Sequence, residues 1–288
     1  MSLAVLGAGG QVGRALTERA GASGVGFDRS ACDICDRTAL ARALSAAELS
    51  VVVNCAAYTA VDRAEREPER AFAVNAAGAA NVAEMAAARN LPVIQLSTDY
   101  VYAGTDAGPH SEATPRAPLN VYGASKTAGD LAVAAANPAH LLLRVSWVFG
   151  VHGTNFVKTM LRLSCERREL RVVDDQRGGP TEARDIADAI LVMAATCRRP
   201  GFDAWGVYHF AGAPMTSWHG FAEAIFQLSC GPKPSLLKIA SRDYPTPARR
   251  PLNSMLDCTR IRQVFGIDQP DWRGSLARVV AELEGAQQ

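Results

Sequence analysis

The sequence lacks an excess of either charge and any long hydrophobic run. Its 30 Lys and Arg residues nearly balance its 29 Asp and Glu residues, so a net charge of +1 gives no electrostatic case for a nucleic-acid or membrane-surface partner. No apolar run reaches the roughly 18 residues that a membrane-spanning helix needs, and the first residues resemble a strand with no basic secretion region. These absences predict a protein of the cytoplasm.

Paired cysteines and metal-binding patterns are also missing. The seven cysteines are odd in number and scattered over a long chain, which favours reduced thiols over a disulfide framework. Cys32 and Cys35 form a C-x-x-C pair, but no second pair or nearby His completes a zinc site. The five His residues show no metal-ligand spacing, so the sequence predicts no metal.

Apolar strands and amphipathic helices do alternate along the first half of the chain. Strands are predicted at 2–6, 24–27, 51–53, 91–96 and 140–145, with helices at 14–20, 71–89 and 122–136. This order predicts an α/β fold with a doubly wound parallel sheet of the Rossmann type. We expect residues 1–149 to form the dinucleotide-binding domain, completed by about 170–200, and residues 150–288 to form mainly a smaller α/β substrate lobe.

The second half of the chain has a less regular pattern. Helices are predicted at 155–165, 183–197 and 275–283, and a strand at 170–173. Beyond about residue 204, aromatic residues, prolines and paired arginines are typical of a lid or substrate lobe.

A glycine turn follows the first strand. Gly7 and Gly10 permit a tight turn in which backbone N–H groups approach a pyrophosphate, and Gly13 lets the next helix pack closely on the strand. The second strand ends at Asp28, where a carboxylate can hold the hydroxyls of an adenosine ribose. Arg29 follows, and an Arg accommodates a 2′-phosphate, so NADPH and NADH both stay open.

Tyr122 and Lys126 lie one helical turn apart, on the same face of a predicted helix. A cation beside a phenol lowers its pKa toward the range useful for proton transfer. The polar segment Ser97-Thr98-Asp99-Tyr100 follows the fourth strand, at the sheet edge where ligands of parallel sheets bind.

Together these segments resemble the extended branch of the short-chain dehydrogenase/reductases, and within it the family of dTDP-4-dehydrorhamnose reductases. The matching segments cover nearly the whole chain and include Gly7-x-x-Gly10-Gln11-Val12-Gly13, Ser97-Thr98-Asp99-Tyr100-Val101, Leu119-Asn120-Val121-Tyr122-Gly123, Ser146-Trp147-Val148 and Tyr244-Pro245-Thr246-Pro247 through Ser254. The resemblance implies reduction of the C4 keto group of dTDP-4-dehydro-L-rhamnose by NADPH or NADH.

The resemblance also implies residue roles. In catalysis, Tyr122 is the proton donor, Lys126 lowers its pKa and binds the nicotinamide ribose, and Thr98 donates a hydrogen bond to the carbonyl. The cofactor residues are Gly7, Gly10, Gln11, Val12, Gly13, Asp28, Arg29, Asp33, Ile34, Cys55, Ala56, Ala57, Tyr58, Tyr122 and Lys126. The residues of the dTDP-sugar site are Asp99, Tyr100, Trp147, Asn155 and Arg250.

Some features depart from the family or leave alternatives open. Family members from some enteric bacteria bind magnesium at a dimer interface, and the positions that correspond here, Ala15 and Arg184, cannot ligate it. We therefore expect no metal, and a monomer or weak homodimer.

Two alternatives to the reductase function stay open. One alternative is a non-catalytic regulatory subunit resembling the β-subunit of methionine adenosyltransferase. Another is a nucleotide-sugar epimerase or dehydratase, although dehydratases carry Asp-Glu where this chain has Asp99-Tyr100.

Overall fold

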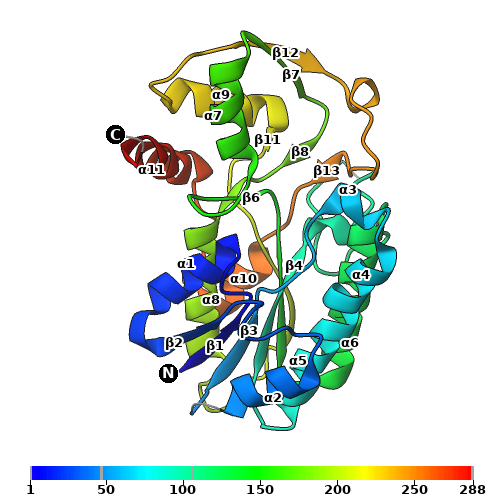
Figure 1. The fold of residues 1–288 in the computed structure, drawn as a ribbon. Helices are drawn as coiled ribbons and strands as arrows, with labels where there is room; N and C mark the ends of the chain where they lie inside the picture. Colours follow the sequence, from blue (N-terminus) through cyan, green and yellow to red (C-terminus); the bar gives the residue numbers. More distant parts are fainter. Residues whose placement is uncertain (1, 46–47, 106, 287–288) are drawn as a thin grey trace.

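The computed structural model describes residues 2–45, 48–105 and 107–286. Within them a parallel sheet of six strands forms in the order β10-β5-β4-β3-β1-β2 (Figure 1). Its strands are β1 (Leu3–Leu6), β2 (Gly24–Phe27), β3 (Val51–Asn54), β4 (Val93–Thr98), β5 (His140–Val145) and β10 (Gly206–Phe210). The order reverses between β1 and β3, which is where open parallel sheets bind their ligands.

Helices cover both faces of this sheet, as its largely buried central strands require. One face carries α1 (Gln11–Ala20), α8 (Ala183–Thr196) and α10 (Thr259–Phe265). The other carries α2 (Arg37–Ser45), α5 (Ala79–Ala87) and α6 (Val121–Ala136). The predicted α/β fold with a doubly wound sheet is confirmed.

The predicted helix at 71–89 is interrupted. It consists of α4 (Pro68–Phe72), a π-helical segment (Ala73–Gly78) and α5, and it follows the short α3 (Val61–Ala64). The wider π turn carries Asn75, whose side chain donates to the Tyr58 carbonyl and to the Ser125 hydroxyl of α6. A Cβ on Gly129 would lie 2.0 Å from the Asn75 carbonyl oxygen, so α6 packs directly on this segment.

A second group of elements, the upper lobe, lies above the carboxyl ends of the strands (Figure 1). Its apolar core includes Phe149, Phe221, Trp272 and Leu276. The helices are α7 (Phe156–Glu166), α9 (Trp218–Leu228) and α11 (Trp272–Gly285), and the strands are β6 (Val148–Phe149), β7 (Glu169–Val173), β8 (Arg177–Gly178), β9 (Thr181–Glu182), β11 (Thr216–Ser217), β12 (Ser235–Ile239) and β13 (Asn253–Ser254). Short 3-10 turns occupy Gly21–Ser23, Asp99–Val101 and Ser241–Asp243.

The prediction that residues beyond about 204 form a lid or substrate lobe is wrong for two segments, which belong to the main sheet and its helical cover. Gly206–Phe210 pairs with β5 as the edge strand of the main sheet, and α10 packs beneath it. Five residues with mixed polarity give no clear period, so the sequence pattern did not separate this strand from its surroundings. The division at residue 150 itself stays a prediction.

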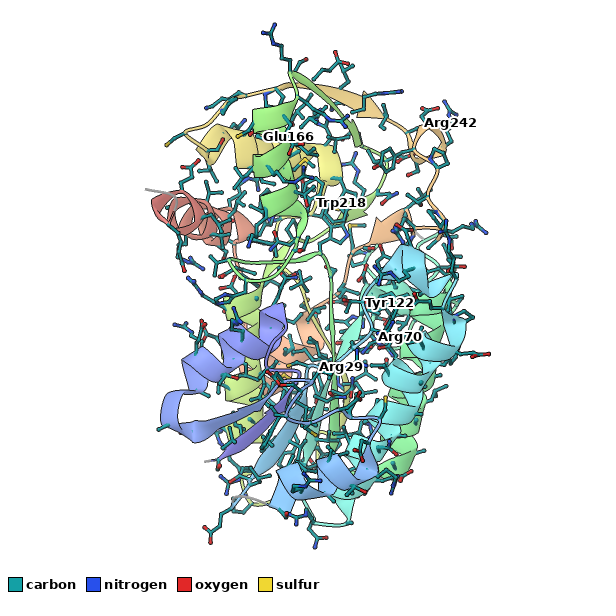
Figure 2. All side chains as sticks on the ribbon, in the orientation of Figure 1. Arg29, Arg70, Tyr122, Glu166, Trp218 and Arg242 are labelled. Atoms are coloured by element: carbon teal, nitrogen blue, oxygen red, sulfur yellow. The ribbon has the colours of Figure 1, made fainter. Side chains whose placement is uncertain are left out.

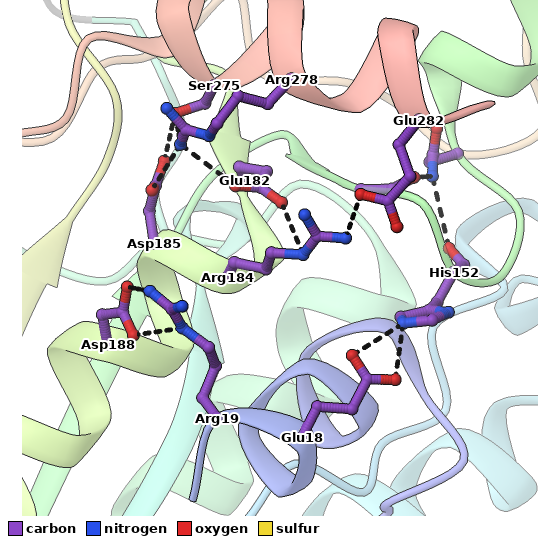
Figure 3. A network of polar contacts seen from close by, with 12 residues as sticks. Glu18, Arg19, His152, Glu182, Arg184, Asp185, Asp188, Ser275, Arg278 and Glu282 are labelled. Carbon is purple, nitrogen blue, oxygen red and sulfur yellow. Dashed lines mark hydrogen bonds and ion pairs between the residues drawn. The ribbon is translucent and has the colours of Figure 1, made fainter. Parts of the chain in front are cut away.

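An ionic seam joins α1, α8 and α11 (Figure 3). Arg184 at the start of α8 donates to Glu282 of α11 and lies 3.8 Å from the buried carboxylate of Glu182. Arg278 of α11 pairs with Asp185.

Ala15, one of the two positions that correspond to the family's magnesium ligands, is buried in the core. Over residues 2–45, 48–105 and 107–286, no cluster of three His, Cys, Asp or Glu side chains could hold a metal ion. No helix in these ranges is long and apolar enough to cross a membrane.

Candidate active site

Two adjoining cavities form a cleft at the carboxyl edge of the sheet. The larger, about 590 Å³, lies between the sheet and the upper lobe, and the smaller, about 230 Å³, lies at the side of β2. Gly10, Cys55 and Ala57 line both, so the two cavities meet at these residues. An elongated two-part cleft at the switch point of the sheet suits a dinucleotide and a second ligand.

The glycine turn shapes the middle of this cleft. Gly7 has φ +77°, and a Cβ there would lie 2.5 Å from the Ala56 nitrogen, while a Cβ on Gly13 would lie 2.2 Å from the Gly7 carbonyl oxygen. The backbone therefore requires both glycines. A Cβ on Gly10 would meet only the Gly7 carbonyl at 3.4 Å, so this glycine instead leaves the cleft open.

The first turn of α1 faces the larger cavity. Gly10, Gln11, Val12 and Gly13 line it, and no side chain caps the helix. The N–H groups at the start of α1 are thus available to an anion, and the helix dipole favours negative charge there. These features fit the pyrophosphate of a dinucleotide.

The smaller cavity holds several residues expected at the adenosine end. Arg29, Asp33, Ile34, Ala56 and Tyr58 line it together with Gly7, Gly9, Cys32 and Val74. Arg29 is exposed and lies 3.4 Å from Asp33. Asp28 is not among the residues that line the cavity, and its Oδ1 accepts hydrogen bonds from the Ser30 N–H and hydroxyl and from the Ala31 N–H. These hydrogen bonds lower the pKa of Asp28. Its predicted role at the ribose stays a prediction.

Tyr122 and Lys126 enter the larger cavity from α6, whose start is fixed by its cap. The Asn120 side chain accepts from the Gly123 N–H at 2.8 Å and donates to the Arg249 carbonyl at 2.7 Å. Gly123 is needed here because a Cβ would lie 2.2 Å from the Tyr100 carbonyl oxygen. The helix therefore begins close enough to the sheet for its first turns to reach the cleft.

Burial dominates the protonation of both groups. The Lys126 ammonium, 3% exposed, donates to the Leu96 carbonyl at 2.7 Å, and burial lowers its pKa. Burial also raises the pKa of Tyr122, against a smaller lowering by a hydrogen bond with Thr98. The shift at Tyr122 is therefore opposite to the one expected from the sequence, because the phenol is enclosed. A protonated Tyr122 at neutral pH is the form that can donate a proton.

Thr98, Asp99 and Tyr100 also line the larger cavity. The Thr98 hydroxyl donates to Asp99 Oδ1 at 2.9 Å and accepts from the Tyr100 N–H at 3.2 Å. Burial raises the pKa of Asp99 to about 6. Because the Thr98 hydroxyl has one proton, it must turn away from Asp99 before it can donate to a carbonyl in the cavity.

Aromatic residues of the upper lobe close the cavity opposite Tyr122. Trp147 stacks on Trp218 with ring centroids 3.7 Å apart and planes 8° apart, and Phe156 lies beside Trp218. All three line the cavity, and Figure 2 shows Trp218 in the upper lobe above Tyr122. The sequence predicted Trp147 here, but it did not place Trp218 or Phe156 among the residues of the site.

Two predicted substrate residues lie beside the cavity without lining it. Asn155 caps α7, and its side-chain amide donates to Gln11 Oε1 at 2.9 Å and to the Gly150 carbonyl at 2.7 Å. Arg250 pairs with Asp62 at 2.9 Å and lies 5.9 Å from the centre of the Tyr100 ring. Their contacts with a substrate stay predictions.

The resemblance noted in the sequence agrees with comparisons to known proteins. Residues 1–284 match the family described as the RmlD substrate binding domain. The chain is 43% identical to the dTDP-4-dehydrorhamnose reductase of Sinorhizobium fredii over 289 residues, which cover 98% of each chain. The chain belongs to the dTDP-4-dehydrorhamnose reductase family.

Other members of this reductase family agree in sequence and in structure. The Escherichia coli dTDP-4-dehydrorhamnose reductase is 38% identical, again with 98% of each chain covered. The dTDP-4-dehydrorhamnose reductase of Bacillus anthracis, solved in complex with NADP, has a TM-score of 0.91 at 33% identity and covers 98% of this chain and 100% of its own. The family assignment made from sequence motifs is thus confirmed.

Proposed function

We propose that this protein reduces the C4 keto group of dTDP-4-dehydro-L-rhamnose to give dTDP-L-rhamnose, with NADPH or NADH as the reductant. The observation that carries the proposal is that Thr98, Tyr122 and Lys126 line one cavity together with residues of the glycine turn. Its relatives carry this activity in their names.

A nicotinamide cofactor supplies the hydride in such a reduction. The chain's own groups handle the charge on the carbonyl oxygen: Tyr122, protonated in the enclosed cavity, donates the proton. The Thr98 hydroxyl, once it turns from Asp99, stabilises the developing negative charge, and the Lys126 ammonium binds the cofactor ribose. The start of α1 holds the pyrophosphate.

The upper lobe holds the sugar nucleotide in this proposal. Trp147 packs against the sugar, while Asp99, Tyr100 and Asn155 lie near its hydroxyls, and Arg250 meets the diphosphate. The binding of Arg250 to a diphosphate requires it to move from Asp62 or to bridge to the ligand with its second nitrogen. A cytoplasmic location, the absence of a metal requirement and a monomer or weak homodimer also stay predictions.

The test is an assay of NADPH and NADH oxidation with dTDP-4-dehydro-L-rhamnose, run in EDTA and compared with the UDP and GDP analogues. We expect turnover with the dTDP substrate and a lower kcat/KM with the analogues. If NADPH binds but no sugar nucleotide is reduced, a regulatory role on the same fold becomes the better account.

A further inference from the structure

A pair of buried charges, Asp130 of α6 and Arg144 of β5, lies behind the site. Asp130 follows Lys126 by four residues, one turn along the same face of α6. Arg144 of β5 donates to Asp130 Oδ2 through Nε at 3.2 Å and through Nη2 at 3.1 Å. Both side chains are only 1% exposed, and Asp130 Oδ1 is buried without a hydrogen-bond partner in the described ranges. The pair therefore costs desolvation that its own hydrogen bonds do not fully offset.

A contribution to the stability of the fold is a weak explanation for the presence of this buried ion pair, because apolar residues of similar volume often stabilise a core as well or better. Arg144 is fixed on its other side as well. It donates to the Tyr102 hydroxyl at 2.6 Å, and this hydroxyl lies 2.8 Å from His209 Nε2. The guanidinium is thus held rigidly against Asp130.

We propose that Asp130 is a positioning residue for the reduction: its carboxylate, held in place by the two hydrogen bonds from Arg144, keeps Lys126 in the ammonium form that binds the cofactor ribose. The inference rests on the proposed function. Within the described protein the Lys126 ammonium makes one hydrogen bond, to the Leu96 carbonyl, and the residue is almost fully shielded from solvent. It therefore needs a negative charge nearby to stay protonated. Asp130 is the group that most strongly opposes the effect of burial on the pKa of Lys126.

The other ionisable groups packed around Lys126 do not supply this charge. Cys55, after β3, has its pKa raised to about 12 by burial and is a neutral thiol. Asp99 and Tyr100, after β4, raise the pKa of Tyr122, as Asp130 also does, but only Asp130 and Cys55 oppose the effect of burial on Lys126. Glu84 of α5 is half exposed and pairs with Arg37. Among the residues with described positions, Asp130 is left as the counter-charge of Lys126.

Asp130→Asn, which keeps the shape and removes the charge, tests the proposal. Two profiles against pH are measured: kcat/KM, and the dissociation constant of NADPH from protein fluorescence. Removing a negative charge lowers the pKa of Lys126, so we expect the alkaline limb of both profiles to move down by about 0.5–1 pH unit. Asp130→Glu restores the charge and should return both limbs toward the wild-type position.

A purely structural role gives a different result. Activity, affinity or melting temperature would then fall while both limbs stay in place, and this outcome overturns the proposal. If Asp130→Asn fails to fold because Arg144 loses its partner, the double variant Asp130→Asn, Arg144→Gln removes both charges and should move both limbs in the same direction by a smaller amount. If wild type binds NADPH but reduces no sugar nucleotide, the proposed function fails, while the NADPH profile still tests Asp130.

Discussion

Gly10→Val is the sharpest test of the cofactor cleft, because Gly10 lines both of its cavities. The backbone of Gly10 has φ −80° and ψ 171°, an extended conformation that valine favours. Its new Cβ would lie 3.4 Å from the nearest atom, the Gly7 carbonyl oxygen, which is ordinary contact. The variant should therefore fold, with its side chain standing where a pyrophosphate must approach the start of α1.

The expected loss follows from the contacts that the side chain blocks. Hydrogen bonds to a charged group contribute about 1.5–3 kcal/mol each, and losing two of them weakens binding by roughly 10²- to 10⁴-fold. Isothermal titration calorimetry with NADPH measures this change directly. Unfolding by urea should give a free energy close to that of wild type.

Two matched variants separate binding from folding. Gly108 is exposed, and a Cβ added there meets nothing within 4 Å. Gly108→Val should therefore change neither the affinity for NADPH nor the free energy of unfolding. Gly13→Ala would place a Cβ 2.2 Å from the Gly7 carbonyl oxygen, and it should destabilise the fold. A folded Gly10→Val protein with wild-type affinity for NADPH would show that the pyrophosphate does not lie at the start of α1.

Three further changes give distinct readouts. Tyr122→Phe keeps the ring and removes the acid, so kcat should fall about 10²-fold or more with little change in NADPH affinity, and near-normal turnover would remove Tyr122 from the mechanism. Arg29→Ala should weaken NADPH roughly tenfold and NADH hardly at all, since only NADPH carries the 2′-phosphate, and equal losses would contradict this role. Burial raises the pKa of Glu182 from 4.5 to about 7, so the folded protein holds this proton more tightly and loses stability as the pH rises through that window. Glu182→Gln should accordingly raise the free energy of unfolding by about 1–2 kcal/mol at pH 8 and less at pH 4, and urea unfolding that showed the reverse order would contradict the argument.

The part of the site that the sequence predicts is the part built from local geometry. Gly7, Gly10 and Gly13 follow a strand, and Tyr122 and Lys126 share a helix face, so spacing alone places them. The stack of Trp218 on Trp147 joins segments 71 residues apart in the sequence, and no local pattern encodes that contact. The same holds for the salt bridge of Arg250 with Asp62, which sequence reasoning could not foresee.

Electrostatics was also harder to predict than position. The sequence predicts that the positive charge of Lys126 lowers the pKa of Tyr122, which assumes that both groups are well solvated. In the structure both groups are enclosed, and burial shifts the pKa of each away from its charged form, against smaller opposing effects of Thr98 on Tyr122 and of Asp130 on Lys126. The fold class needed only the alternation of strands and helices, whereas the protonation states needed the burial of each side chain.

The late position of β10 has a consequence for how the chain reaches its native state. This edge strand pairs with β5 although 60 residues separate them, and the intervening chain builds part of the upper lobe. A nascent chain that has emerged only through β5 therefore presents an unpaired strand edge, a template for association with other chains. We therefore expect fragments ending near residue 150 to aggregate more readily than the complete chain.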